Sequence, residues 1–156
     1  MAVAKSVKKY LQKEGVDYDV TIHAPRESAS RSAQAAHVSG EQVAKSVVLH
    51  DGDEYMLAVL PATHRLEVDS LERLVNRRLG LASEIELGDL FTDCEIGAVP
   101  AIGVPYGLEV VLDERLAAQP DIYFEAGDHR SLVHMSGKSY SQLMQNARLG
   151  QFSHHV

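Results

Sequence analysis

Two apolar runs separated by a short polar turn constrain the fold of this chain most strongly. Residues 45–50 and 54–60 are mostly β-branched or aliphatic, and they flank Asp51-Gly52-Asp53. An Asp-Gly pair between two such runs is typical of a β-hairpin, because glycine adopts the positive φ that tight turns require. The pattern therefore predicts two antiparallel strands that lie next to each other inside a sheet.

Weaker patterns predict further elements on both sides of this hairpin. Apolar residues recur at helical spacing in residues 2–14, 28–38, 69–79, 83–90 and 139–147, and short strand-like runs cover 17–23, 108–112, 122–125 and 131–135. Helices and strands do not alternate regularly, and several strands follow one another directly. We therefore predict an α+β fold, with a mixed, largely antiparallel, curled and barrel-like sheet and helices packed outside it. We expect one domain over residues 1–150, followed by a frayed tail at 151–156.

Composition and charge exclude several classes of protein. The 156 residues are 45% hydrophobic and 24% charged, which is typical of a globular protein. No apolar run reaches the roughly 18–20 residues that a membrane span needs, and the N-terminus has no apolar signal-peptide core. The single Cys94 cannot form an internal disulfide, which fits a reducing, cytoplasmic location. A net charge of −7 argues against broad electrostatic binding to DNA or RNA, although recognition of one RNA end stays open.

The usual motifs of metal and nucleophile chemistry are absent from the sequence. Eight histidines are present, but they show neither His-Glu-x-x-His spacing nor a cysteine pair, so we expect no metal and no cofactor. The chain also lacks a Gly-x-Ser-x-Gly elbow and a phosphate-binding glycine loop. Cys94 has no sequence cue that links it to a base, so we interpret it as a packed thiol.

Three features remain as candidates for a binding or catalytic site. Lys45 begins an apolar strand, where a cation is costly unless it meets an anion or the rim of a cleft. The segment Gly97–Gly103 is a short apolar loop whose glycines allow the main chain to approach a ligand closely. His129 follows Gly127-Asp128 in a turn. The residues alone also allow an interpretation without function. In it, Lys45 begins its strand with the ammonium in water, and residues 97–103 form an ordinary tight loop.

In their order along the chain, the motifs resemble the YbaK/prolyl-tRNA editing-domain family, which is related to the editing domain of bacterial prolyl-tRNA synthetase. The resemblance covers nearly the whole chain. It rests on Val43-Ala-Lys-Ser-Val-Val-Leu49, Leu57-Ala-Val-Leu-Pro-Ala62 with Arg65, Leu81-Ala-Ser-Glu84, Gly97-Ala-Val-Pro100 with Gly103, Val110-Val-Leu-Asp113 and Ala126-Gly-Asp-His129.

The resemblance implies a free-standing aminoacyl-tRNA deacylase of translation quality control. Such an enzyme hydrolyses the ester of a mischarged tRNA, commonly Ala- or Cys-tRNA-Pro, with a positioned water and no covalent intermediate. Its partners would be the 3′ aminoacyl end of tRNA and an aminoacyl-tRNA synthetase. The implied catalytic groups are Lys45, which engages the terminal phosphate, and Gly97, whose main chain holds the carbonyl and the water. The implied substrate-binding residues are Ser46, Ala98, Val99, Pro100 and His129.

Departures from the family pattern leave an alternative function open. Many members have Pro-Pro-Phe-Gly where this chain has Pro100-Ala101-Ile102-Gly103, and His64 stands where an acidic residue is frequent. These changes leave the amino acid and the tRNA undetermined. They also leave room for a non-catalytic module that uses the same pocket for a nucleotide, an amino acid or a synthetase partner.

Overall fold

The computed structural model describes residues 3–23, 33, 38–52 and 54–156 of the chain. The helices are α1 (Lys5–Glu14), α3 (Val68–Val75), α4 (Glu84–Leu90), α5 (Glu114–Ala117) and α6 (Gly137–Leu143), with the 3₁₀ turns η1 (Gly40–Gln42) and η2 (Val104–Tyr106). The strands are β1 (Asp19–Ile22), β2 (Val43–His50), β3 (Tyr55–Pro61), β4 (His64–Leu66), β5 (Gly80–Leu81), β6 (Glu109–Asp113), β7 (Asp121–Glu125), β8 (Ser131–Ser136), β9 (Arg148–Gly150) and β10 (Ser153–His155).

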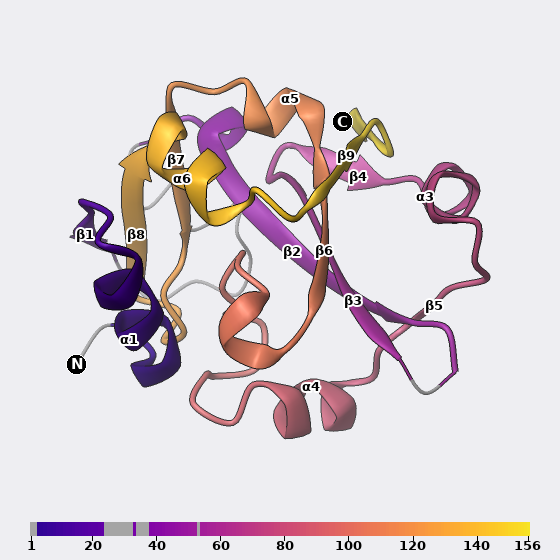
Figure 1. Cartoon of the computed structure of the whole chain (residues 1–156), viewed down its shortest axis with the longest axis horizontal. Helices are drawn as coiled ribbons and strands as arrows, with labels where there is room; N and C mark the ends of the chain where they lie inside the picture. The colour runs from indigo at the N-terminus through magenta and orange to yellow at the C-terminus, as the bar shows by residue number, and fades with distance from the viewer. Residues whose placement is uncertain (1–2, 24–32, 34–37, 53) are drawn as a thin grey trace.

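An eight-stranded mixed sheet organises the described chain. Seven strands follow the order β1-β8-β7-β2-β3-β6-β9, β5 pairs with β2, and β4 and β10 form a separate two-stranded sheet. Figure 1 shows the helices arranged around this sheet, with α1 beside β8 and α3 at the far end of the molecule. The predicted α+β class is confirmed. The sheet is curved but open, because β1 and β9 form its two ends instead of pairing with each other as in a closed barrel.

The predicted hairpin is the centre of the sheet. β2 and β3 pair antiparallel from Ala44↔Pro61 to His50↔Tyr55, and Gly52 in the turn has a φ of 104°. On its other side β3 pairs in parallel with β6, so it is covered along both edges. Six of its seven residues are buried, which explains why its sequence is a continuous apolar run without polar alternation.

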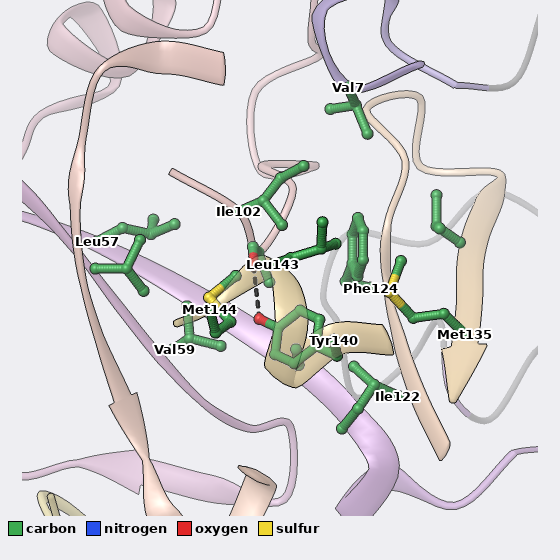
Figure 2. Packing of buried hydrophobic residues seen from close by; sticks show 14 of the residues in the cluster. Val7, Leu57, Val59, Ile102, Ile122, Phe124, Met135, Tyr140, Leu143 and Met144 are labelled. Carbon is green, nitrogen blue, oxygen red and sulfur yellow. Dashed lines mark hydrogen bonds between the residues drawn. The ribbon is translucent and has the colours of Figure 1, made fainter. Parts of the chain in front are cut away.

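Hydrophobic clusters pack on both sides of the hairpin. The larger cluster contains Val7, Leu57, Ile102, Phe124 and Tyr140, and Figure 2 shows them converging from the sheet and the surrounding segments. Buried aromatic and aliphatic side chains of this kind supply the main favourable term in folding. A second cluster is built on Leu49, Leu60, Leu71 and Phe152. The pleat of β2 therefore contributes side chains to two separate cores.

Several helices differ in length from their predicted ranges for identifiable reasons. α1 ends where predicted, because Gly15 adopts the left-handed conformation with a φ of 66°. α3 ends earlier than residue 79, because Asn76 takes the same conformation with a φ of 56°. α6 ends before residue 147, and the chain then enters β9. α4 begins with the predicted capping box of Ser83 and Glu86. The helix predicted over 28–38 falls almost entirely outside the described residues.

The expected frayed tail at 151–156 is wrong. β10 pairs with β4 from Ser153↔Leu66 to His155↔His64, and the Phe152 side chain is fully buried. The tail also bonds to a buried acid, since Ser153 Oγ donates to Asp113 Oδ2 over 2.8 Å. An apolar anchor and a buried polar contact together hold the tail in place, although its sequence is short and polar. In the described part of the chain, no helix has both the length and the apolar character to cross a bilayer.

Candidate functional site

A cavity opens where β2 lacks a neighbouring strand. On the edge that faces away from β3, β2 pairs with β7 only at Val43 and Ala44 and with β5 only at Leu49 and His50. Between these pairings lies a cavity of about 220 Å³. Its lining consists of Ala44, Lys45, Ser46 and Val48 of β2, Leu87 of α4, Gly97 and Val99 of the following loop, and Glu125 of β7.

The register of β2 directs main-chain groups of Ser46 toward this cavity. Ala62 N donates to Val43 O on the β3 side, and Ala82 N donates to Val48 O on the opposite side. In an antiparallel ladder the direction of these groups alternates along the strand, so Ser46 N–H and C=O face the cavity edge. The Ser46 hydroxyl is also buried and has no hydrogen-bond partner within the described residues. One residue thus provides a hydroxyl, an amide and a carbonyl at the cavity wall.

Lys45 lines the cavity while its side chain leaves β2 on the opposite face from Ser46. Its ammonium donates a hydrogen bond to the main-chain carbonyl of His64. Burial, and secondarily the charge of Arg65, lowers the pKa of Lys45 from its usual value. Lys45 takes part in no ion pair within the described chain. A ligand that carries an anion would therefore find this cation unpaired by any carboxylate of the described residues.

A buried polar network fixes the residue that holds Lys45. His64 Nδ1 lies 2.9 Å from Ser153 Oγ, which in turn donates to Asp113 Oδ2. Because Ser153 donates its proton to the acid, His64 must carry the proton on Nδ1. Arg115 Nη2 lies 2.9 Å from the same carboxylate and completes the network. His64, which stands where an acidic residue is frequent in the family, therefore belongs to a buried network that includes the C-terminal strand.

The Gly97–Gly103 loop supplies the second wall of the cavity and part of the core. Gly97 has a φ of 86°, a conformation that favours glycine. Gly97 and Val99 line the cavity, whereas Ala98 and Pro100 are buried residues outside its lining. The loop is fastened to its neighbour by a hydrogen bond of 2.7 Å from Glu95 N to Gly127 O.

The unusual Ala101-Ile102 pair belongs to the core. Both side chains are fully or almost fully buried in the larger cluster. The Tyr140 hydroxyl donates to the Ala101 carbonyl over 2.6 Å, as the dashed line in Figure 2 shows. At these two positions, where the sequence differs from the family pattern, the side chains thus fill the interior and do not line the cavity.

His129 contacts the chain just before the loop. Its backbone has a φ of 59°, and its Nε2 is 2.5 Å from the carbonyl oxygen of Ile96, the residue before Gly97. The ring nitrogen must donate there, because a carbonyl only accepts. His129 is not part of the cavity lining. The structure brings Lys45, Ser46, Gly97 and Val99 together at the cavity, and it leaves His129 outside the lining, bonded to the Ile96 carbonyl.

Glu125 is a cavity residue that the motifs did not indicate. It ends β7, it is only 3% exposed, and it contributes to the cavity wall. The available signal was an acidic residue at the end of an apolar strand, which the sequence alone cannot distinguish from a solvent-exposed strand end. Among the described residues, no group of three or more His, Cys, Asp and Glu side chains could hold a metal ion.

Comparison with known proteins agrees with the resemblance seen in the motifs. The model of the aminoacyl-tRNA editing domain matches residues 23–143 of this chain. None of the curated proteins matches it. A crystal structure described as a "putative trans-editing enzyme for prolyl tRNA synthetase" is similar with a TM-score of 0.82 and 27% identity, over 97% of this chain and 96% of that one. The structure of hypothetical protein APE2540 shows the same fold, with a TM-score of 0.84 and 21% identity over 96% of this chain and 100% of that one.

Proposed function

Since the chain belongs to the aminoacyl-tRNA editing-domain family, we propose that it is an aminoacyl-tRNA deacylase that acts in trans on a mischarged tRNA. The observation that carries this proposal is the cavity beside β2. It combines the Lys45 cation, the polar groups of Ser46 and the Gly97 main chain in one small space. The structure described as a "putative trans-editing enzyme", which is similar over nearly its whole length, supports an action independent of a synthetase domain.

The cavity suits a small amino acid attached to a terminal adenosine. Its walls at Val48, Leu87 and Val99 are apolar, and its volume is only about 220 Å³. Ala or Cys on tRNA-Pro are the substrates that we propose. A size-limited second pocket is useful because a synthetic site discriminates one methylene by only about 1–3 kcal/mol.

Lys45 would bind the phosphate of the terminal nucleotide. An ammonium held by a neutral carbonyl can exchange it for an anion, which gives a stronger, charge-assisted hydrogen bond. The binding of that anion would offset the burial that lowers the pKa of Lys45. The ester carbonyl would then lie against the Ser46 and Gly97 groups, where a positioned water attacks it.

This chemistry needs no protein nucleophile. The Cys94 thiol lies outside the cavity lining, and burial raises its pKa to about 12. A thiol with that pKa contains almost no thiolate at neutral pH. It also contacts the Tyr106 hydroxyl over 3.3 Å, as expected for a packed side chain. An aminoacyl ester is already activated, so positioning of a water is sufficient.

The test is hydrolysis of a panel of Ala-, Cys-, Ser- and Pro-tRNA-Pro by the wild-type protein and by Lys45→Ala. We expect rapid hydrolysis of one mischarged species and a loss of roughly 100-fold in kcat/KM for the variant, as is usual when a substrate is mispositioned. Lys138→Ala in α6, an exposed lysine, is the matched control and should keep full activity. If no species is cleaved above the uncatalysed rate, the deacylase proposal is wrong and the alternative of a non-catalytic binding module gains support.

A further inference from the structure

The cavity beside β2 has one cationic and one anionic side chain in its wall, Lys45 and Glu125. The two residues occupy equivalent places on neighbouring parallel strands. Ala44↔Phe124 is the last registered pair of β2 and β7, so Lys45 and Glu125 are the next positions on their strands. Side chains at laterally adjacent positions of neighbouring strands point to the same face of a sheet. Opposite charges are therefore held at the point where the two strands part and the cavity begins.

The two charged residues lie in different surroundings. The Lys45 ammonium donates to the His64 carbonyl, and Lys45 forms no ion pair in the described part of the chain. Glu125 is almost fully buried, so its carboxylate acts in a medium of low dielectric constant, where charges interact strongly. A ligand with an anion at one end and a cation at the other would match this pattern.

We infer that Glu125 binds the α-ammonium group of the aminoacyl moiety, and this inference rests on the proposed function. An aminoacyl-tRNA end has a phosphate on one side of its ester and an α-ammonium group on the other. Lys45 takes the phosphate and Glu125 takes the ammonium, so the ester is held between them near Ser46 and Gly97. Glu125 is thus a specificity residue that selects a free α-amino group and rejects N-blocked esters such as peptidyl-tRNA.

The test compares two ligands that differ only in this charge. One is 3′-amino-3′-deoxyadenosine 5′-phosphate acylated with alanine through an amide, which resists hydrolysis. The other carries lactate, in which a hydroxyl replaces the ammonium at the same size. We expect the wild-type protein to bind the alanyl amide about 10- to 100-fold more tightly in calorimetric titration, the range for one hydrogen bond between charged groups.

Glu125→Gln should abolish this preference while the affinity for the lactyl amide stays the same. Glu95→Gln, an exposed acid on the neighbouring loop, is the matched control and should keep the preference. Equal binding of the two amides by the wild-type protein overturns the inference without any variant, so the test holds even if Glu125→Gln does not fold. A Glu125→Gln protein that keeps the preference overturns it as well.

Hydrolysis separates this inference from the proposed function. We expect the wild-type protein to cleave alanyl-tRNA-Pro faster than lactyl-tRNA-Pro, and Glu125→Gln to cleave both at the lower rate. An equal loss on both esters, with unchanged binding of the amides, would assign Glu125 to the chemical step and overturn its role in selection. If neither ester is cleaved but the alanyl amide is preferred through Glu125, the deacylase function fails and the ligand selection stands.

Discussion

The two faces of β2 differ in how their polar side chains are bonded. One face carries Ala44, Ser46 and Val48, which lie at the cavity, and the Ser46 hydroxyl has no hydrogen-bond partner among the described residues. The other face carries Leu49 and Lys45, where Leu49 packs into the second core and Lys45 bonds to the carbonyl of His64. The Ser46 hydroxyl on the first face is left available for a ligand, whereas the Lys45 ammonium on the second face must exchange its bond to the His64 carbonyl before it can bind one. The alternation of side chains along β2 thus places the Ser46 hydroxyl and the Lys45 ammonium on opposite faces, and each face also packs into one of the two cores.

The largest effect on stability is expected at Leu49, on the face of β2 that packs into the second core. Its side chain is fully buried in the cluster with Leu60, Leu71 and Phe152, so Leu49→Ala leaves a cavity. We expect the free energy of unfolding in urea to fall by about 2–5 kcal/mol. Leu81→Ala, at an exposed leucine of β5, is the control and should change it little. A loss below about 1 kcal/mol at Leu49 would contradict the assignment of this face to the core.

A smaller loss is expected for Asp113→Asn, which weakens the network beneath His64. The carboxylate is fully buried and accepts from Arg115, from Ser153 and from Phe152 N. The amide leaves part of these donors unsatisfied, so we expect a loss of about 1–3 kcal/mol in urea unfolding. The neighbouring Glu114→Gln, at an exposed acid, is the control. Near-equal stability of the two variants would show that the network does not hold β10.

On the face of β2 that carries Ser46, we expect a substitution to lower activity without lowering stability. Ser46→Ala removes a hydroxyl that has no partner among the described residues, so the free energy of unfolding should change by less than about 0.5 kcal/mol. Loss of one hydrogen bond to the substrate should lower kcat/KM about five- to tenfold. Both are measured on one preparation, by urea unfolding and by deacylation. A loss of stability with unchanged activity would show that the Ser46 hydroxyl supports the fold and does not bind the substrate.

The smallest effect is a pH dependence at His64. Burial lowers the pKa of His64 from its usual 6.5, so below pH 6.5 the unfolded chain takes up a proton that the folded chain resists. The free energy of unfolding should therefore decrease as the pH falls from 7.5 to 5.5. His64→Gln should flatten this decline, whereas His154→Gln, at an exposed histidine of the tail, should keep it. Equal slopes for His64→Gln and the wild-type protein in urea unfolding at several pH values would refute this origin.

Local sequence determined much of the fold because its signals depend on near neighbours. The Asp-Gly turn specified the β2–β3 hairpin, Gly15 ended α1, and the Ser83–Glu86 spacing began α4. These features arise from main-chain conformation and hydrogen bonds within a few residues, so they are visible in the sequence. The ordered motifs likewise indicated the family, which the editing-domain match confirms.

Tertiary structure decided what depends on residues far apart in the chain. The tail forms β10 because Phe152 and Ser153 meet partners about 40 residues earlier, such as Asp113, and no local pattern encodes such a contact. Whether Glu125 is exposed or part of a cavity depends on where β7 parts from β2, which is a matter of strand order. The sequence by itself determined the hairpin and the family of this protein. Only the packing of distant strands decided which side chains of that hairpin face a ligand, because a strand's neighbours are set by the whole chain.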